Sequence, residues 1–184
     1  TVAGVKSNSS GFGPAALVRV GAAITGGTVT GTANTQLSNI QNNGRGRPFW
    51  IDGTDHAVTG TVIDGVCDNP NAVRAGGLIS IASGANQIDG VLIDGLFADS
   101  NAQPALEVLM AGSGTLRDVN ISGMDANGAA GTGLSLVRTS GSLNTVIAGP
   151  NANLRSRATP IYRSGTQSNI VIAPGVLPNT SGPV

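Results

Sequence analysis

The stretch Val62-Ile63-Asp64-Gly65 decides the fold, because the chain repeats it at nearly regular intervals. The later copies keep the isoleucine and a glycine shortly after it: Leu92-Ile93-Asp94-Gly95, Asn120-Ile121-Ser122-Gly123, Val146-Ile147-Ala148-Gly149 and Val171-Ile172-Ala173-Pro174-Gly175. The isoleucines lie 30, 28, 26 and 25 residues apart. A period of this length is typical of stacked copies of one structural unit. The sequence therefore predicts a solenoid.

Each repeat also contains a second short apolar segment. These segments are Phe49-Trp50-Ile51, Leu78-Ile79-Ser80-Ile81, Leu106-Glu107-Val108-Leu109, Leu134-Ser135-Leu136-Val137 and Ile161-Tyr162-Arg163. Turns rich in Ser, Gly and Asn, such as Ser83-Gly84-Ala85-Asn86, mark the points where strands end. One coil is therefore expected to run through a strand, a turn, a second strand and a longer turn.

The composition agrees with an all-β chain that contains many turns. Of the 184 residues, 28 are glycine, 11% are charged and 40% are hydrophobic, which is too apolar for a disordered chain. The length fits one domain. We expect an N-terminal arm or cap over residues 1–25, a solenoid of about five to six coils over 26–173, and a C-terminal tail over 174–184.

The charge pattern argues against several classes of partner. The formal net charge is zero and the ten cations are spread along the chain, so the basic stripe of a nucleic-acid-binding protein is missing. The longest apolar runs are too short to cross a bilayer. No P-loop, nucleophile elbow or metal-spaced Cys/His set occurs, so we expect no cofactor and no metal.

In a solenoid the strands stack on copies of themselves, so positions that point inward form ladders of similar residues. The best such ladder is Ile63, Ile93, Ile121, Ile147 and Ile172. A second is Leu78, Leu106, Leu134 and Ile161. Because side chains alternate along a strand, the residues just before the isoleucines should point outward: Val62, Leu92, Asn120, Val146 and Val171.

This outward stripe is mostly apolar, and a monomer rarely leaves such a stripe in water. Either a loop covers it, or our register is off by one residue, or it is an oligomer interface. We favour the interface, formed by Val62, Leu92, Val146 and Val171 in a homotrimer with three solenoids around a threefold axis.

The repeated Ile-Asp-Gly phrase, the turns such as Ser83-Gly84-Ala85-Asn86 and the repeat length resemble those of right-handed parallel β-helix proteins. That family includes pectate-lyase-like enzymes and the tailspike and appendage proteins of bacteriophages. The resemblance covers nearly the whole chain and implies a right-handed parallel β-helix. The similar phage proteins work as trimers. A β-sandwich is the alternative fold, since short strands and glycine-rich turns suit both.

Asp64 and Asp94 are the first catalytic candidates. They occupy the same position in adjacent repeats, so their Cα atoms should lie about 5 Å apart. Retaining glycosidases use two carboxyl groups at about that separation. However, later copies of the phrase replace the aspartate by Ser122, Ala148 and Ala173. We therefore interpret both aspartates as solvated outward residues beside a turn glycine.

Other catalytic sites are less well supported. A lyase would need Ca²⁺ held by several acids, for example Asp68 beside Asp64 and Asp94, with Arg74 or Arg45 as the base, but no tight acidic motif occurs. The single histidine, His56, lies in a turn sequence and is interpreted as a surface residue. The single cysteine, Cys67, cannot form an internal disulfide and is interpreted as a small core residue.

Arg45, Arg47, Trp50 and Tyr162 are the best candidates for a partner or glycan contact, because arginine and aromatic residues are enriched at binding hot spots. From the resemblance we predict a non-enzymatic structural protein of a bacteriophage virion surface, that is, a trimeric spike, appendage or capsid-decorating protein. Its N-terminal arm would dock on other virion proteins, and contact with a host surface glycan is left open. The alternative is a polysaccharide-degrading tailspike depolymerase or lyase fragment that uses Asp64 and Asp94, and a bacterial adhesin is a third hypothesis.

Overall fold

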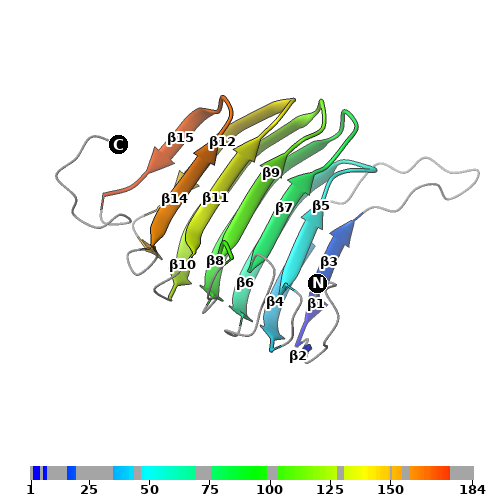
Figure 1. Ribbon diagram of the computed structural model, residues 1–184. Helices are drawn as coiled ribbons and strands as arrows, with labels where there is room; N and C mark the ends of the chain where they lie inside the picture. Colours follow the sequence, from blue (N-terminus) through cyan, green and yellow to red (C-terminus); the bar gives the residue numbers. More distant parts are fainter. Residues whose placement is uncertain are drawn as a thin grey trace, which may run out of the picture.

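The computed structural model describes residues 2–4, 6–7, 16–19, 35–43, 47–68, 76–98, 103–127, 131–149, 151–154 and 158–174. These residues form fifteen β-strands and no helix. The strands stack side by side along one axis as a parallel β-solenoid of about four turns (Figure 1). The predicted all-β solenoid is confirmed. The turn count is slightly below the predicted five to six, because the first repeat contributes only short strands.

Two parallel sheets form the walls of the solenoid. The strands of the first sheet are β1 (Val2–Ala3), β2 (Lys6–Ser7), β4 (Thr35–Asn42), β6 (Val58–Asp68), β8 (Gln87–Ala98), β10 (Thr115–Ala126), β12 (Ser142–Ala148), β13 (Ala152–Asn153) and β15 (Ser168–Ile172). They follow the order β1-β4-β6-β8-β10-β12-β15, with β2 paired to β4 and β13 paired to β10.

The second sheet contains six shorter strands, which face the first sheet across the core. They are β3 (Ala16–Arg19), β5 (Phe49–Asp52), β7 (Gly77–Ile81), β9 (Leu106–Met110), β11 (Thr132–Arg138) and β14 (Thr159–Ser164), in the order β14-β11-β9-β7-β5-β3. Residues 1–25, predicted to be an arm or cap, thus contribute β1, β2 and β3. Much of residues 1–25 and the tail from residue 175 lie outside the described residues.

The predicted isoleucine ladder is confirmed in part. Ile63, Ile93 and Ile121 pair in register and are buried. Ile121 then pairs with Ala148, and Ala148 pairs with Ile172, so our placement of Ile147 in the core was wrong.

The placement of Val146 on the outer surface was wrong for the same reason. Its exposed fraction is 0%, and Ile147 takes the outward position instead. A shift of one residue moves a side chain to the opposite face of a strand. The spacing of isoleucine and glycine did not reveal this shift, because β12 has its isoleucine at the outward position and Ala148 at the inward one.

The second ladder is also confirmed with one exception. Leu106, Leu134 and Ile161 pair in register. Leu78 instead pairs with Trp50, and Gly77 takes the ladder position between Phe49 and Leu106. The Phe49 ring fills the space above Gly77, since a Cβ on this glycine would lie 2.7 Å from the ring Cε1 atom. A large residue on one coil therefore requires the smallest one on the next.

The strands of the first sheet bend at two places where the backbone is left-handed. At the first bend the stacked residues are Gly60, Gly90, Asp118, Thr145 and Asn169, with φ between 52° and 72°. At the second bend they are Asn39, Gly65 and Gly95, with φ between 52° and 100°. On the next coil Gly123 follows after a register irregularity, and its φ is not positive. The glycine of the repeated phrase therefore forms the second bend.

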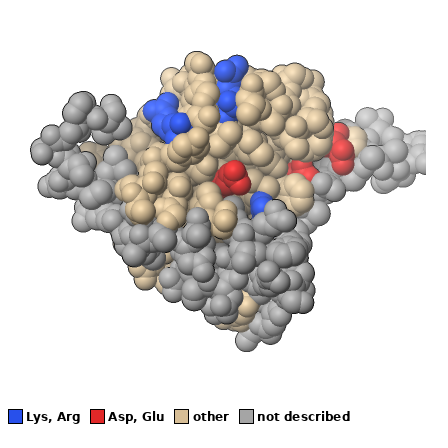
Figure 2. Space-filling model, viewed as in Figure 1, with Lys and Arg blue, Asp and Glu red and all other residues tan. Residues whose placement is uncertain are grey.

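Between the bends lies a facet of the first sheet that carries the outward stripe. Figure 2 shows the opposite side, that of the second sheet, where charged side chains among the described residues are few and separated by uncharged ones. The core behind the facet is filled by buried aliphatic side chains together with Phe49.

Candidate functional site

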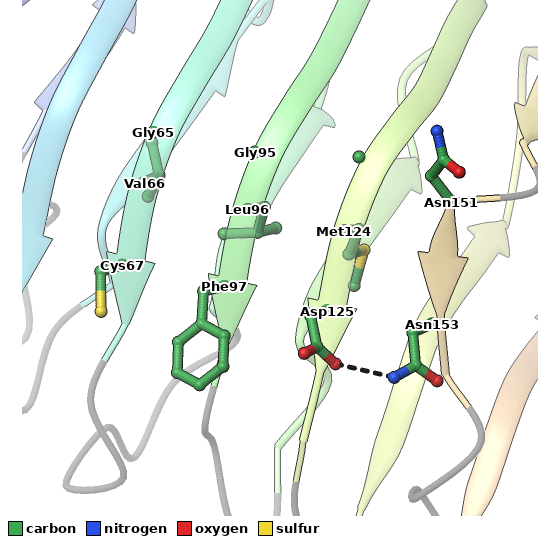
Figure 3. A pocket seen from close by; sticks show the side chains of 11 residues that line it. Gly65, Val66, Cys67, Gly95, Leu96, Phe97, Met124, Asp125, Asn151 and Asn153 are labelled. Carbon is green, nitrogen blue, oxygen red and sulfur yellow. Dashed lines mark hydrogen bonds between the residues drawn. The ribbon is translucent and has the colours of Figure 1, made fainter.

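A groove runs along the solenoid at the second bend (Figure 3). Gly65, Gly95 and Gly123, from three successive coils, form its floor, and its volume is about 590 Å³. The coils approach closely here. A Cβ on Gly95 would lie 2.9 Å from the backbone nitrogen of Gly65, and a Cβ on Gly123 would lie 2.9 Å from that of Gly95. Gly95 and Gly123 therefore lack room for a side chain, which leaves the floor of the groove open.

One wall of the groove is a ladder of outward residues, which we call the groove ladder. It consists of Cys67, Phe97, Asp125 and Asn153, which pair in this order on neighbouring strands. The Phe97 ring is 41% exposed. The Asn153 Nδ2 atom donates a hydrogen bond of 3.1 Å to Asp125 Oδ1, which links the two neighbouring polar side chains of the ladder (Figure 3).

Asp64 and Asp94 border the opposite side of the glycine floor. They pair in register, as their shared position in the repeat predicted, and both are exposed. Their carboxylates lean toward the next coil: Asp94 Oδ1 lies 2.8 Å from where a Cβ on Gly123 would be. On the next coil a register irregularity pairs Gly123 with Asp94, and the hydroxyl of the preceding Ser122 donates to the Ile93 carbonyl at 3.3 Å. Neither aspartate has the buried setting that prepares a carboxyl group for acid catalysis.

Neither the other described catalytic candidates, His56 and Asp68, nor Asp52, which lies in the turn sequence before His56, are among the residues that line this groove. Asp52 is buried and accepts a hydrogen bond of 3.0 Å from the Thr54 backbone nitrogen, which stabilises a turn. His56 lies in the same turn and is partly exposed. Asp68 ends strand β6, whereas Arg45 and Arg74 lie outside the described residues.

Of the predicted contact residues that the structure describes, Arg47 and Trp50 lie together, whereas Tyr162 lies apart from them. The Arg47 guanidinium lies 5.9 Å from the centre of the Trp50 ring, and Trp50 Nε1 donates to Ser80 Oγ at 2.8 Å. Tyr162 is 48% exposed but lies on β14, at the far end of the second sheet from β5. Four strand pairings separate it from Trp50, a distance of roughly 19 Å along the axis.

The outward stripe on the facet consists of Val62, Leu92, Asn120, Ile147 and Val171, paired in this order. We call it the facet stripe. Val62, Leu92 and Ile147 are half-buried, and Val171 is 52% exposed. Asn120 interrupts the stripe with a polar, exposed side chain. Its apolar members are those of the predicted interface, with Ile147 in place of Val146.

An ion pair lies on the other side of the first bend. Arg117 Nη2 donates to Asp89 Oδ2 at 2.7 Å, and Arg117 Nε and Gln87 Nε2 each donate to the same oxygen at 3.1 Å. The hydrogen bond from Arg117 lowers the pKa of Asp89 below its usual value and raises the pKa of Arg117. The pair joins β8 and β10 on the surface.

Sequence reasoning missed the groove and its ladder. Phe97 and Asp125 each follow the bend glycine by two residues, as does Cys67, and this shared offset is the signal that could have found them.

Within the described ranges, no group of three or more His, Cys, Asp or Glu side chains is arranged to hold a metal ion. In the same part of the chain, no helix is long and apolar enough to span a bilayer.

Comparisons with families of known proteins, with curated proteins and with solved structures found no match for this chain.

Proposed function

We propose that the chain is a non-enzymatic structural protein of a bacteriophage virion surface: a spike, an appendage or a capsid-decorating subunit. The observation that carries this proposal is the facet stripe, a mostly apolar row on a straight and regular wall. The phage setting comes from the resemblance of the repeats to phage tailspike and appendage proteins. The dense stacking of parallel strands suits a rigid support.

The stripe fits self-association because of its position. The row continues in register over five neighbouring strands, so the same row on a second copy can approach it along its length. Burial of apolar surface contributes about 25 cal/mol per Å². Three copies around one axis would bury the stripe of each copy, and the N-terminal arm would remain available to bind other virion proteins.

Light scattering after size-exclusion chromatography tests this assembly. We expect a mass three times that of the chain, and a clean monomer would overturn the proposal. Leu92→Arg should reduce the mass to that of the monomer, because it places a charge in the middle of the stripe. Tyr162→Arg is the matched control, since Tyr162 is exposed on the opposite sheet and should leave the mass unchanged.

The second candidate is a polysaccharide-degrading depolymerase or lyase, favoured by the register of Asp64 and Asp94 beside a groove. Its test is incubation with capsular and pectic polysaccharides. We expect no new reducing ends and no unsaturated products. Activity that disappears in Asp64→Asn or Asp94→Asn would establish the enzyme instead.

A further inference from the structure

The groove at the second bend carries a chemical pattern of its own, separate from the facet stripe. We propose that it binds, without cleavage, a glycan chain whose sugars carry free amino groups. This inference rests on the proposed function only in that it assumes a non-enzymatic surface protein. Four features of the groove support it: its shape, the Phe97 ring, the sign of its charges and the pairing of its strands.

The shape suits a linear ligand that lies along the solenoid axis. The floor glycines belong to three successive coils, so the floor extends about 10 Å at the usual spacing between strands. The groove is open along its length and does not enclose a cavity. A small molecule would therefore keep much of its surface in water, whereas a chain can follow the floor and continue beyond both ends.

Phe97 provides the apolar contact. Its ring stands in the middle of the groove ladder with 41% of its surface exposed, between Cys67 and Asp125 (Figure 3). The flat C–H face of a sugar ring can pack on an exposed aromatic ring. The same ring face attracts a cation within about 6 Å of its centre.

The charges along the groove have one sign. Asp64 and Asp94 border the floor on one side, and Asp125 belongs to the groove ladder on the other. Among the described residues that line or border the groove, none is Lys or Arg. Charge complementarity therefore favours an ammonium group and disfavours uronic acids or sulfated sugars. The amides of Asn151 and Asn153 can bond sugar hydroxyl groups, because an amide both donates and accepts.

The strand pairing favours a glycan over a basic peptide. A peptide usually binds a β-protein by adding a strand to a free sheet edge. Here β8 pairs with β6 on one side and with β10 on the other, so its edges are occupied. The groove also crosses the strands at right angles. A ligand must therefore bind through side chains and ring contacts, as a sugar chain does.

Isothermal titration of the full chain with three hexasaccharides tests the proposal. We expect the glucosamine hexamer to bind, the N-acetylglucosamine hexamer to bind at least tenfold more weakly, and the galacturonic acid hexamer not to bind. Equal binding of the acetylated hexamer, preference for the uronic acid, or no binding of glucosamine would overturn it. Hexalysine is the fourth ligand, and binding as tight as that of glucosamine would show an acidic patch without glycan selectivity.

Two variants locate the site. Phe97→Ala should weaken binding of the glucosamine hexamer at least tenfold, and Asp125→Asn should weaken it severalfold while reducing the preference over the acetylated form. Tyr162→Ala, which removes an exposed aromatic ring from the other sheet, is the matched control and should bind normally. Circular dichroism confirms that each variant is folded. Unchanged binding in Phe97→Ala overturns the site, and the mass of the assembly remains an independent test of the proposed function.

Discussion

The two bends of the first sheet look alike in backbone conformation but differ in what they tolerate. The first bend stacks two glycines with Asp118, Thr145 and Asn169. The second bend keeps a glycine on each of the three coils that form the groove floor. The backbone is left-handed at all five stacked residues of the first bend and at Asn39, Gly65 and Gly95 of the second, and this conformation disfavours most L-residues. Conformation alone therefore does not explain the difference.

The space between neighbouring coils explains why the two bends accept different residues. At the first bend, a Cβ on Gly90 would lie 3.6 Å from the backbone nitrogen of Gly60, which is ordinary contact. At the second bend, a Cβ on Gly95 would lie 2.9 Å from the nitrogen of Gly65, which is too close. The first bend can thus diverge in sequence while it sets the strand register. At the second bend, where Asn39 precedes the glycines, Gly95 and Gly123 lack room for a Cβ, and a groove remains.

The largest expected effect comes from breaking the register that the first bend sets. Val146→Asp should destabilise the protein by about 4 kcal/mol or more, because it buries an unpaired carboxylate in the core. Ile147→Asp should cost less than about 1 kcal/mol in the isolated chain, since that side chain lies on the outer face. Urea denaturation at pH 7 measures both. Equal losses in the two variants would contradict the register.

A smaller loss of stability should distinguish the two bends, when a glycine of each is replaced by alanine. Gly95→Ala should lower the free energy of unfolding by about 3 kcal/mol, because a strained φ of 100° combines with a backbone clash. Gly90→Ala should lower it by about 1 kcal/mol, the cost of the left-handed conformation alone. Thermal and urea unfolding of the pair give the difference. If the two alanines cost the same, space between coils does not distinguish the bends.

The sequence predicted the solenoid because its period and its inward isoleucines are local patterns. It did not predict the groove, because the groove depends on two glycines from different coils that nearly touch. It also misplaced Val146 and Ile147, since Ile147-Ala148-Gly149 imitates the repeated phrase although the inward position of this coil is Ala148, three residues after Thr145 as Ile121 is three after Asp118. Left-handed backbone at a threonine has no signature in sequence. Asp64 and Asp94 were placed correctly, because both repeats keep the same bends.

A substitution of Thr145 at the first bend should stabilise the protein. A β-branched residue with a φ of 52° is rare, whereas asparagine tolerates this conformation and occupies it in the next coil as Asn169. Thr145→Asn should therefore raise the free energy of unfolding by about 0.5–1 kcal/mol. Thr145→Val, which keeps the branching and removes the hydroxyl, should give no gain. The urea midpoints of the two variants, compared with the wild type, measure the change in stability. A higher stability of the valine variant would argue against backbone strain as the cause.

The smallest effect concerns the ion pair beside the first bend. Because Arg117 lowers the pKa of Asp89 in the folded state from its usual value of 3.8, the pair stabilises the fold at pH values above the unfolded pKa. That contribution is lost as the pH falls through the lower folded pKa. Asp89→Asn should therefore be slightly less stable than the wild type at pH 7, and the difference should disappear near pH 2. Because the pair is at the surface, 1 M salt should also reduce the difference at pH 7. A difference that persists at pH 2 would mean that Asp89 acts through packing at the bend and not through its charge.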